Sequence, residues 1–197
     1  MQTKNRKCSY CKKKVPAETA IRGGLRAFCS MEHLMAFTKS EAGQKVVRKA
    51  VRQDTKEQLE RMKSRSQWLT EAQRAFNAWI RWRDRKDACI SCGEKPSERV
   101  GGAFDAGHYI DVGDAGRGSY RRFDTNNVHA QCKKCNRFSN SGVKDVYRKQ
   151  LIAKIGLEKV EELESVREQK RFNVEKLKRI KAVFQKRLRI NKKIVDR

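Results

Sequence analysis

The residues with the clearest chemical potential in this sequence are seven cysteines and three histidines, because eight of these ten form two sets with metal-ligand spacing. In each set a Cys-x2-Cys pair, which bends the backbone so that two thiolates can bind one tetrahedral Zn²⁺, precedes a second pair of ligands. The two sets are Cys8, Cys11, Cys29 and His33, and Cys89, Cys92, Cys132 and Cys135. Since every cysteine is used, the sequence predicts two structural zinc sites. The first spacing is looser, and His33 could instead simply begin a helix.

The other two histidines, His108 and His129, both lie between the two cysteine pairs of the second set. His108 follows Asp105-Ala-Gly, and His129 follows Asn126-Asn-Val. A lone histidine on a strand is usually structural. Next to Asp and Gly in a loop tied by zinc, a histidine can instead serve as a base for phosphodiester hydrolysis, which also needs a cation for the leaving oxygen.

Four segments with different composition would position these residues. The sequence predicts a zinc-knuckle module at 1–38, a basic amphipathic helical segment at 39–84, a zinc-tied core at 85–147 and basic helices at 148–197. We expect the second segment to break near Ser64 to Ser66, with Ser66 as the N-cap of its second half. Asn173 is the expected cap of the last helix. Apolar stripes run along these helices and are candidates for either core or a dimer interface.

The charge of the chain favours a polyanionic partner. It has 48 Lys and Arg against 23 Asp and Glu, a formal net charge of +25. Nucleic acid is the leading candidate, because phosphate binding by basic residues releases counterions. An acidic protein and an anionic membrane surface are the rivals. The sequence shows no stretch long and apolar enough to span a bilayer and no signal peptide, so we expect a cytoplasmic protein with reduced cysteines.

Several motifs occur together in the order seen in a known family, and they cover roughly residues 65–165. They are Phe76-Asn-Ala-Trp-Ile80, Arg83-Asp-Arg85, Cys89-Ile-Ser-Cys-Gly93, Asp105-Ala-Gly-His-Tyr109, Arg122-Phe123, Asn127-Val-His-Ala-Gln-Cys132, Tyr147-Arg148 and Leu151-Ile-x3-Gly156. This arrangement resembles the NinG (Rap) recombination proteins of lambda-like phages, and its centre resembles an HNH (ββα-metal) nuclease motif in its four-cysteine form.

The resemblance implies a mostly helical α+β fold. A small zinc-stabilised HNH-like core would be flanked by long basic helices, with the zinc-knuckle module at the N-terminus. The implied function is a structure-specific endonuclease that cuts branched DNA such as Holliday junctions and D-loops in the cytoplasm of a bacterial host. His108 matches the general base, Asn127 the residue that holds the His108 loop and ring, and Asn136 a ligand of the catalytic Mg²⁺ or Mn²⁺.

One position departs from the HNH pattern. Many such motifs place Asp directly before the base, whereas this sequence has Gly107. Asp105 or His129 could supply the missing ligand, and Asp105 is the first choice because Mg²⁺ prefers oxygen. Flanking phosphates would be held by basic residues near the core, namely Arg121, Arg122, Lys133, Lys134 and Arg137.

Two alternatives remain open from the sequence. The chain could be a non-catalytic zinc-dependent DNA-binding protein in which His108 and His129 are structural. Its oligomeric state is also open, and a homodimer would provide the two active sites that symmetric cutting of a four-way junction needs.

Overall fold

The structure, a computed structural model, describes residues 5–96, 104–112, 121–137, 141–165 and 171–195, and the chain divides into two compact units. The N-terminal unit comprises Met1–Lys63 and the C-terminal unit Ser64–Arg197. The four segments expected from composition are distributed over these two units. The predicted helical segment 39–84 is split between them, so its first half belongs with the zinc-knuckle module and its second half with the core.

The N-terminal unit consists of two small hairpins and two helices. The antiparallel pairs are β1 (Arg6–Lys7) with β2 (Lys14–Val15), and β3 (Ile21–Gly23) with β4 (Arg26–Phe28). They are followed by α1 (Met31–Lys39) and α2 (Glu41–Met62). The core of this unit is small, and its buried members are Cys8, Val15, Phe28 and Phe37. So few apolar residues form a weak core on their own, which is the situation that structural zinc commonly remedies.

A sharp corner joins α1 to α2, and it is set by Ser40 and Gly43. The Ser40 N–H donates to the last carbonyls of α1, while the Gly43 N–H donates to Ser40 Oγ (3.2 Å) at the start of α2. A Cβ on Gly43 would lie 1.8 Å from the Phe37 carbonyl oxygen, so only glycine allows the two helices to approach this closely. Beyond this corner α2 is exposed, because Gly43 is its only buried residue.

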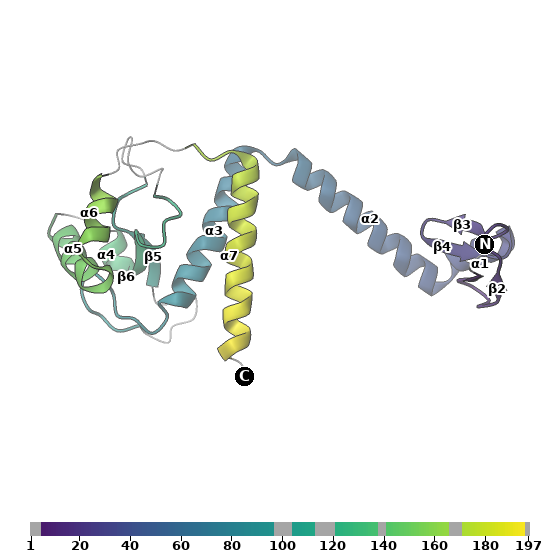
Figure 1. Ribbon diagram of the computed structural model, residues 1–197, viewed down its shortest axis with the longest axis horizontal. Coiled ribbons are helices and arrows are strands. Elements are labelled where there is room, and N and C mark those ends of the chain that lie inside the picture. Colours follow the sequence, from purple (N-terminus) through teal and green to yellow (C-terminus); the bar gives the residue numbers. More distant parts are fainter. Residues whose placement is uncertain (1–4, 97–103, 113–120, 138–140, 166–170, 196–197) are drawn as a thin grey trace. The chain divides into compact units, whose positions relative to one another are not determined.

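The C-terminal unit begins with α3 (Arg65–Arg83), which packs along α7 (Val174–Val195), as Figure 1 shows. The break between α2 and α3 falls where it was expected. The N-cap, however, is Ser64 and not Ser66, because Gln67 completes a capping box with Ser64. Asn173 caps α7 as predicted, since its Oδ1 accepts from the Lys176 N–H at 2.9 Å.

The apolar stripes of α3 and α7 face each other and form core. Ala72 and Phe76 from α3 are fully buried, as is Leu177 from α7, and the Phe76 and Phe184 rings meet edge to face with centroids 4.8 Å apart. Of the two expectations for these stripes, the structure shows core packing within one chain. No helix in the described ranges combines the length and apolar character of a membrane span.

A hairpin and three helices complete this unit. Strand β5 (Phe104–His108) pairs antiparallel with β6 (Val128–Cys132), which runs directly into α4 (Lys133–Arg137). Helices α5 (Ser141–Ile155) and α6 (Leu157–Ser165) meet at Gly156, whose φ of +90° ends α5 as expected. They share a core cluster with the Cys89-x2-Cys92 knuckle. The members of this cluster are Ile90, Tyr147, Leu151, Val160 and Leu163.

Candidate functional site

The second predicted zinc set comes together at one end of the β5–β6 hairpin. Ligand atoms of Cys89, Cys92, Cys132 and Cys135 all lie within 4.8 Å of one another. The sulfurs of Cys92 and Cys132 are 3.8 Å apart, which is close to the edge of a tetrahedron with Zn–S bonds of about 2.3 Å. The Cys132 N–H also donates to Cys89 Sγ (3.2 Å), as backbone amides commonly do in cysteine knuckles. These four residues can hold zinc.

The first predicted set is equally compact. Ligand atoms of Cys8, Cys11, Cys29 and His33 lie within 4.8 Å of one another. His33 sits in the first turn of α1 with its Nδ1 2.8 Å from Cys29 Sγ. It thus begins a helix and also faces the thiolates, so the two interpretations of His33 are compatible. This cluster can hold zinc too.

His108 ends strand β5, and its ring is held by the backbone of another loop. Its Nε2 lies 3.2 Å from the Arg122 carbonyl oxygen, so Nε2–H donates and the lone pair remains on Nδ1. Burial lowers the pKa of His108 below its ordinary value of 6.5; the hydrogen bond to the Arg122 carbonyl opposes this shift, and the Arg122 charge adds to it. His108 is therefore a neutral imidazole at pH 7, which is the form that can accept a proton.

Asn127 ties together the two segments that flank His108. It is fully buried, its Oδ1 accepts from the Ile110 N–H (2.8 Å), and its Nδ2 donates to the carbonyls of Ile110 (3.1 Å) and Arg121 (3.3 Å). The loop after β5 is thus held by the residue just before β6. Asn127 holds the loop as the resemblance implies, whereas the ring of His108 is held by the Arg122 carbonyl.

Asp105 and Asn136 meet on the opposite face of β5 from His108. Asn136 Nδ2 lies 3.2 Å from Asp105 Oδ2, and Asn136 is exposed on α4. Turning the Asn136 amide about its last bond would present Oδ1 beside the carboxylate, which gives two oxygen donors for a hard divalent cation. Alternation along the strand places Asp105 and His108 on different faces, about 10 Å apart along β5. The structure brings the two predicted ligands together but does not bring His108 to them.

The structure gives a steric reason why position 107 is Gly and not the Asp of many HNH motifs. A Cβ at this position would lie 2.1 Å from Gln131 Oε1 and 2.7 Å from Gln131 Cβ. Gln131, which pairs with Asp105 and is therefore the diagonal neighbour of Gly107, is buried and donates to Ser91 Oγ at 2.8 Å. The space that an Asp would need directly before His108 is therefore filled by the Gln131 side chain.

His129 is a core residue and not an available ligand. Only 2% of it is exposed, its Nδ1 lies 3.0 Å from an Arg83 guanidinium nitrogen, and its Nε2 lies 3.0 Å from the Asn126 carbonyl oxygen. Both ring nitrogens are engaged within the protein. Of the two candidates for the missing ligand, the geometry therefore favours Asp105, and the predicted catalytic role of His129 has no structural basis.

The partners of His129 form a buried polar network that the sequence did not reveal. Asp84 Oδ2 accepts from the Ala130 N–H (3.0 Å), and Arg83 donates to Asp84 and to the carbonyls of Thr125 and Val128. Burial would raise the pKa of Asp84, but the hydrogen bonds from Arg83, together with the charges of Arg83 and Lys154, hold this pKa well below its ordinary value. The only available signal was the adjacent Arg-Asp pair at the end of a predicted helix.

The predicted phosphate-binding residues divide into three kinds. Arg121 is 2% exposed and donates to the Glu162 carbonyl, so the prediction that it binds phosphate is wrong. Arg122 is half-buried and donates to Gln73 Oε1 (3.3 Å), while its carbonyl holds His108. Lys133, Lys134 and Arg137 are exposed on α4 and remain available.

This arrangement defines a mostly helical α+β protein with two four-residue sites that can hold zinc, one of them on a strand–strand–helix element. The model of a family described as "Bacteriophage Lambda NinG protein" matches residues 1–194, and the chain belongs to this family. The resemblance to NinG proteins is thereby confirmed.

Curated relatives carry the same family name. The chain is 44% identical over 128 residues to "Protein ninG" of Escherichia phage 933W, a match that covers 65% of this chain and 60% of that protein. Identity is 43% over 128 residues to the proteins of Escherichia phage lambda and Salmonella phage P22, covering 65% of this chain and 59% of each. The match thus spans about three fifths of the relatives' length. No solved structure matches the chain.

Proposed function

We propose that the chain is a divalent-metal-dependent endodeoxyribonuclease that hydrolyses phosphodiester bonds in branched recombination intermediates such as Holliday junctions and D-loops. The observation that carries the proposal is His108, a neutral, half-buried imidazole whose Nε2–H is fixed on the Arg122 carbonyl. Within the described residues no hydrogen bond engages its Nδ1, which can therefore accept a proton. A purely structural histidine would commonly use both nitrogens, as His129 does.

In the proposed reaction His108 Nδ1 removes a proton from water as the oxygen attacks phosphorus in line with the leaving O3′. The P–O3′ bond breaks, which gives a 5′-phosphate and a 3′-hydroxyl after the leaving oxygen is protonated by solvent. Asp105 and Asn136 would hold the divalent cation, which supplies charge stabilisation for the leaving oxygen. Asn127 positions the loop that carries His108 through its bonds to Ile110.

The first test removes the proposed base. His108→Ala should reduce Mg²⁺-dependent cleavage of a labelled four-way junction by about 10²-fold or more, because general base catalysis contributes that much. Because protonated His108 cannot accept a proton, the wild-type cleavage rate should fall as the pH is lowered. The midpoint of this fall should lie below pH 6.5, because the pKa of His108 is lowered. Junction binding should be retained.

His129→Gln is the matched control, because it alters the other histidine of the hairpin. It should affect stability more than the pH dependence of cleavage. The assignment of the base would be contradicted if His108→Ala cleaves at the wild-type rate. It would also be contradicted if the loss of cleavage at low pH shifts only in His129→Gln.

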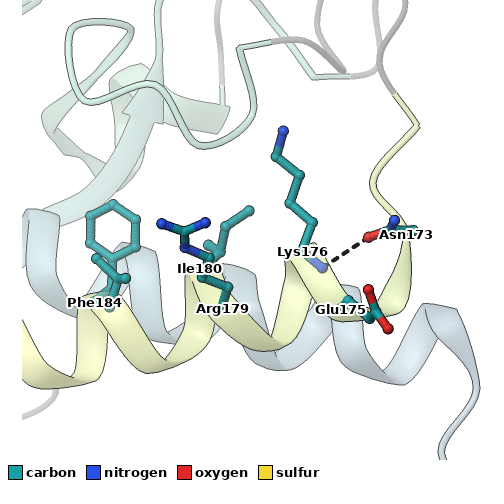
Figure 2. Close-up of a pocket in the computed structure, with 7 residues that line it drawn as sticks. Asn173, Glu175, Lys176, Arg179, Ile180 and Phe184 are labelled. Carbon is teal, nitrogen blue, oxygen red and sulfur yellow. Dashed lines mark hydrogen bonds between the residues drawn. The ribbon is translucent and has the colours of Figure 1, made fainter.

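The proposed DNA contacts come from exposed basic residues on two helices. Lys133, Lys134 and Arg137 lie on α4 directly after the cysteine pair. On α7, a hollow of about 560 Å³ is lined by Lys176 and Arg179 beside Ile180 and Phe184, and Figure 2 shows the side chains of Lys176 and Arg179 extending from the helix. These residues could neutralise phosphates on either side of a cut.

A second function is favoured by one observation: His108 and the Asp105–Asn136 pair lie on different faces of β5. If they never act on the same phosphate, the chain is a zinc-dependent DNA-binding accessory protein without nuclease activity. Cleavage of a junction and of a linear duplex, with and without Mg²⁺, separates these functions. If cleavage requires His108 but not Asp105, the cation is held elsewhere.

The proposed reaction also implies a cellular compartment and an oligomeric state. A bacterial host cytoplasm would supply the DNA and the divalent cation. Paired cutting of a four-way junction needs two active sites, and a homodimer would provide them. Since the stripes of α3 and α7 are buried within one chain, such a dimer would use another surface.

A further inference from the structure

The β3–β4 hairpin of the N-terminal unit ends in an unusual apolar tip. Gly23 pairs with Arg26, so Gly24 and Leu25 form a two-residue loop, and the φ of Gly24 is +62°. A positive φ at the first loop position alone is typical of a type II′ turn. Turn tips usually carry polar residues, yet Leu25 is 99% exposed, more than any other large apolar side chain in the described ranges.

The hairpin that carries Leu25 is firmly held, so its exposure is built into the fold. A Cβ on Gly23 would lie 2.8 Å from Leu34 Cδ1, which shows how closely the hairpin lies against α1. The Ser9 N–H donates to the Ala27 carbonyl at 2.8 Å, which connects β4 to the Cys8-x2-Cys11 knuckle. Phe28, at the base of the hairpin, is buried against Phe37. A rigid base with an exposed apolar tip is suited to insertion into another molecule.

A basic hollow lies beside this tip. It has a volume of about 740 Å³ and is lined by Arg6, Lys7, Arg26 and Lys49 together with Gly24 and Leu25. The four basic side chains come from β1, β4 and α2, and all four residues are exposed. None of the residues that line this hollow is acidic. The charge is therefore complementary to a phosphate backbone.

We propose that the N-terminal unit is a DNA-binding module in which Leu25 inserts between adjacent base pairs while Arg6, Lys7, Arg26 and Lys49 bind the neighbouring phosphates. Apolar wedges of this kind unstack a base step and bend the duplex. Unstacking costs least where stacking is already interrupted, so the module would favour the branch point of a junction over continuous duplex. This inference rests on the proposed DNA partner but not on cleavage.

The test measures unstacking and binding directly. The full chain carries His108→Ala so that DNA stays intact, and the probes are a four-way junction and a linear duplex with 2-aminopurine at one step. Leu25→Ser should abolish the rise in 2-aminopurine fluorescence at the branch point and weaken junction binding by about tenfold, because burying a leucine contributes on that order. Zinc content and circular dichroism confirm that each variant is folded.

Matched controls lie on α2. Leu59→Ser changes another exposed leucine, at 59% exposure, and should leave both readouts unchanged. Lys49→Gln should lower affinity and reduce the slope of log affinity against log salt by about one. Lys56→Gln, two turns further along the same helix face, should not.

Several results would overturn the inference. If Leu25→Ser unstacks the probe like the parent protein, or if Lys49→Gln and Lys56→Gln lose affinity equally, the hollow is not the contact. If polyglutamate of equal charge depends on Leu25 as strongly as the junction does, the partner is an acidic protein. A chain that unstacks DNA through Leu25 but never cuts refutes the nuclease proposal alone, whereas one that cuts without unstacking refutes only this inference.

Discussion

At the scale of single residues, the fates of the two histidines on the hairpin are set by their partners. His108 Nε2 is hydrogen-bonded to a backbone carbonyl, and its Nδ1 has no hydrogen-bond partner among the described residues. In His129 both ring nitrogens are hydrogen-bonded within the core. Spacing alone placed both between the cysteine pairs, and only the resemblance distinguished His108 as the base; the core role of His129 was not visible, since the residue that fixes it is Arg83, 46 positions earlier. Cysteine spacing, by contrast, is local and predicted both ligand sets.

The buried Asp84 carboxylate should contribute strongly to stability. Asp84→Asn should lower the free energy of unfolding by about 3–5 kcal/mol at pH 7, because it breaks a buried ion pair and leaves the Arg83 guanidinium without its anion. Urea unfolding measures the change. Asp87→Asn is the control: its exposed ion pair with Lys154 should matter by about 1 kcal/mol or less. Similar losses from the two variants would contradict the structural role assigned to the buried network.

At the scale of elements, α7 is both a core helix and a basic surface. Its Leu177 and Phe184 are buried, while Lys176, Arg179 and Arg187 are exposed. The sequence predicted the start of this helix and its apolar stripe, because capping and periodicity are local signals. It predicted the break before α3 but not its cap, since Ser64 and Ser66 differ only in where Gln67 falls relative to each. The partner of the stripe, α3, could not be known from periodicity.

Because α7 supports the core, its proposed DNA contacts should be tested by removing charge and not by truncation. The double change Lys176→Gln with Arg179→Gln should weaken junction binding and reduce the salt slope by about two, since two phosphate contacts are lost. The unfolding midpoint should stay within error of the parent protein. Fluorescence anisotropy at several salt concentrations provides the measurement, and an unchanged slope would exclude this face of α7 from the contact.

At the scale of the whole molecule, the chain consists of two units with separate cores and one cysteine cluster each. Composition suggested four segments because it follows charge and glycine content along the chain, whereas a unit is defined by which side chains pack together. Helix α2 carries six basic residues and α3 carries four, yet α3 packs along α7 whereas α2 is exposed beyond Gly43. Length and composition cannot distinguish these two situations.

The two clusters should bind metal independently. We expect two Zn²⁺ per full-length chain by atomic absorption and one in His33→Ala, because loss of a ligand weakens only the first site. Thermal unfolding of His33→Ala should show an early transition from the N-terminal unit, with the transition of the C-terminal unit unchanged. Loss of both metals together would contradict the division into independent units.

The close approach of Gly107 and Gln131 makes the residue types at these two positions depend on each other. An Asp at position 107 alone would collide with Gln131 Cβ, and a smaller residue at position 131 alone would abandon the bond to Ser91. Each single change is costly, so an acidic side chain at position 107 requires a change at position 131 as well. Among family members, the two positions should therefore covary: an acidic residue at 107 should accompany a glycine at 131, because every other residue keeps the Cβ that lies 2.7 Å away.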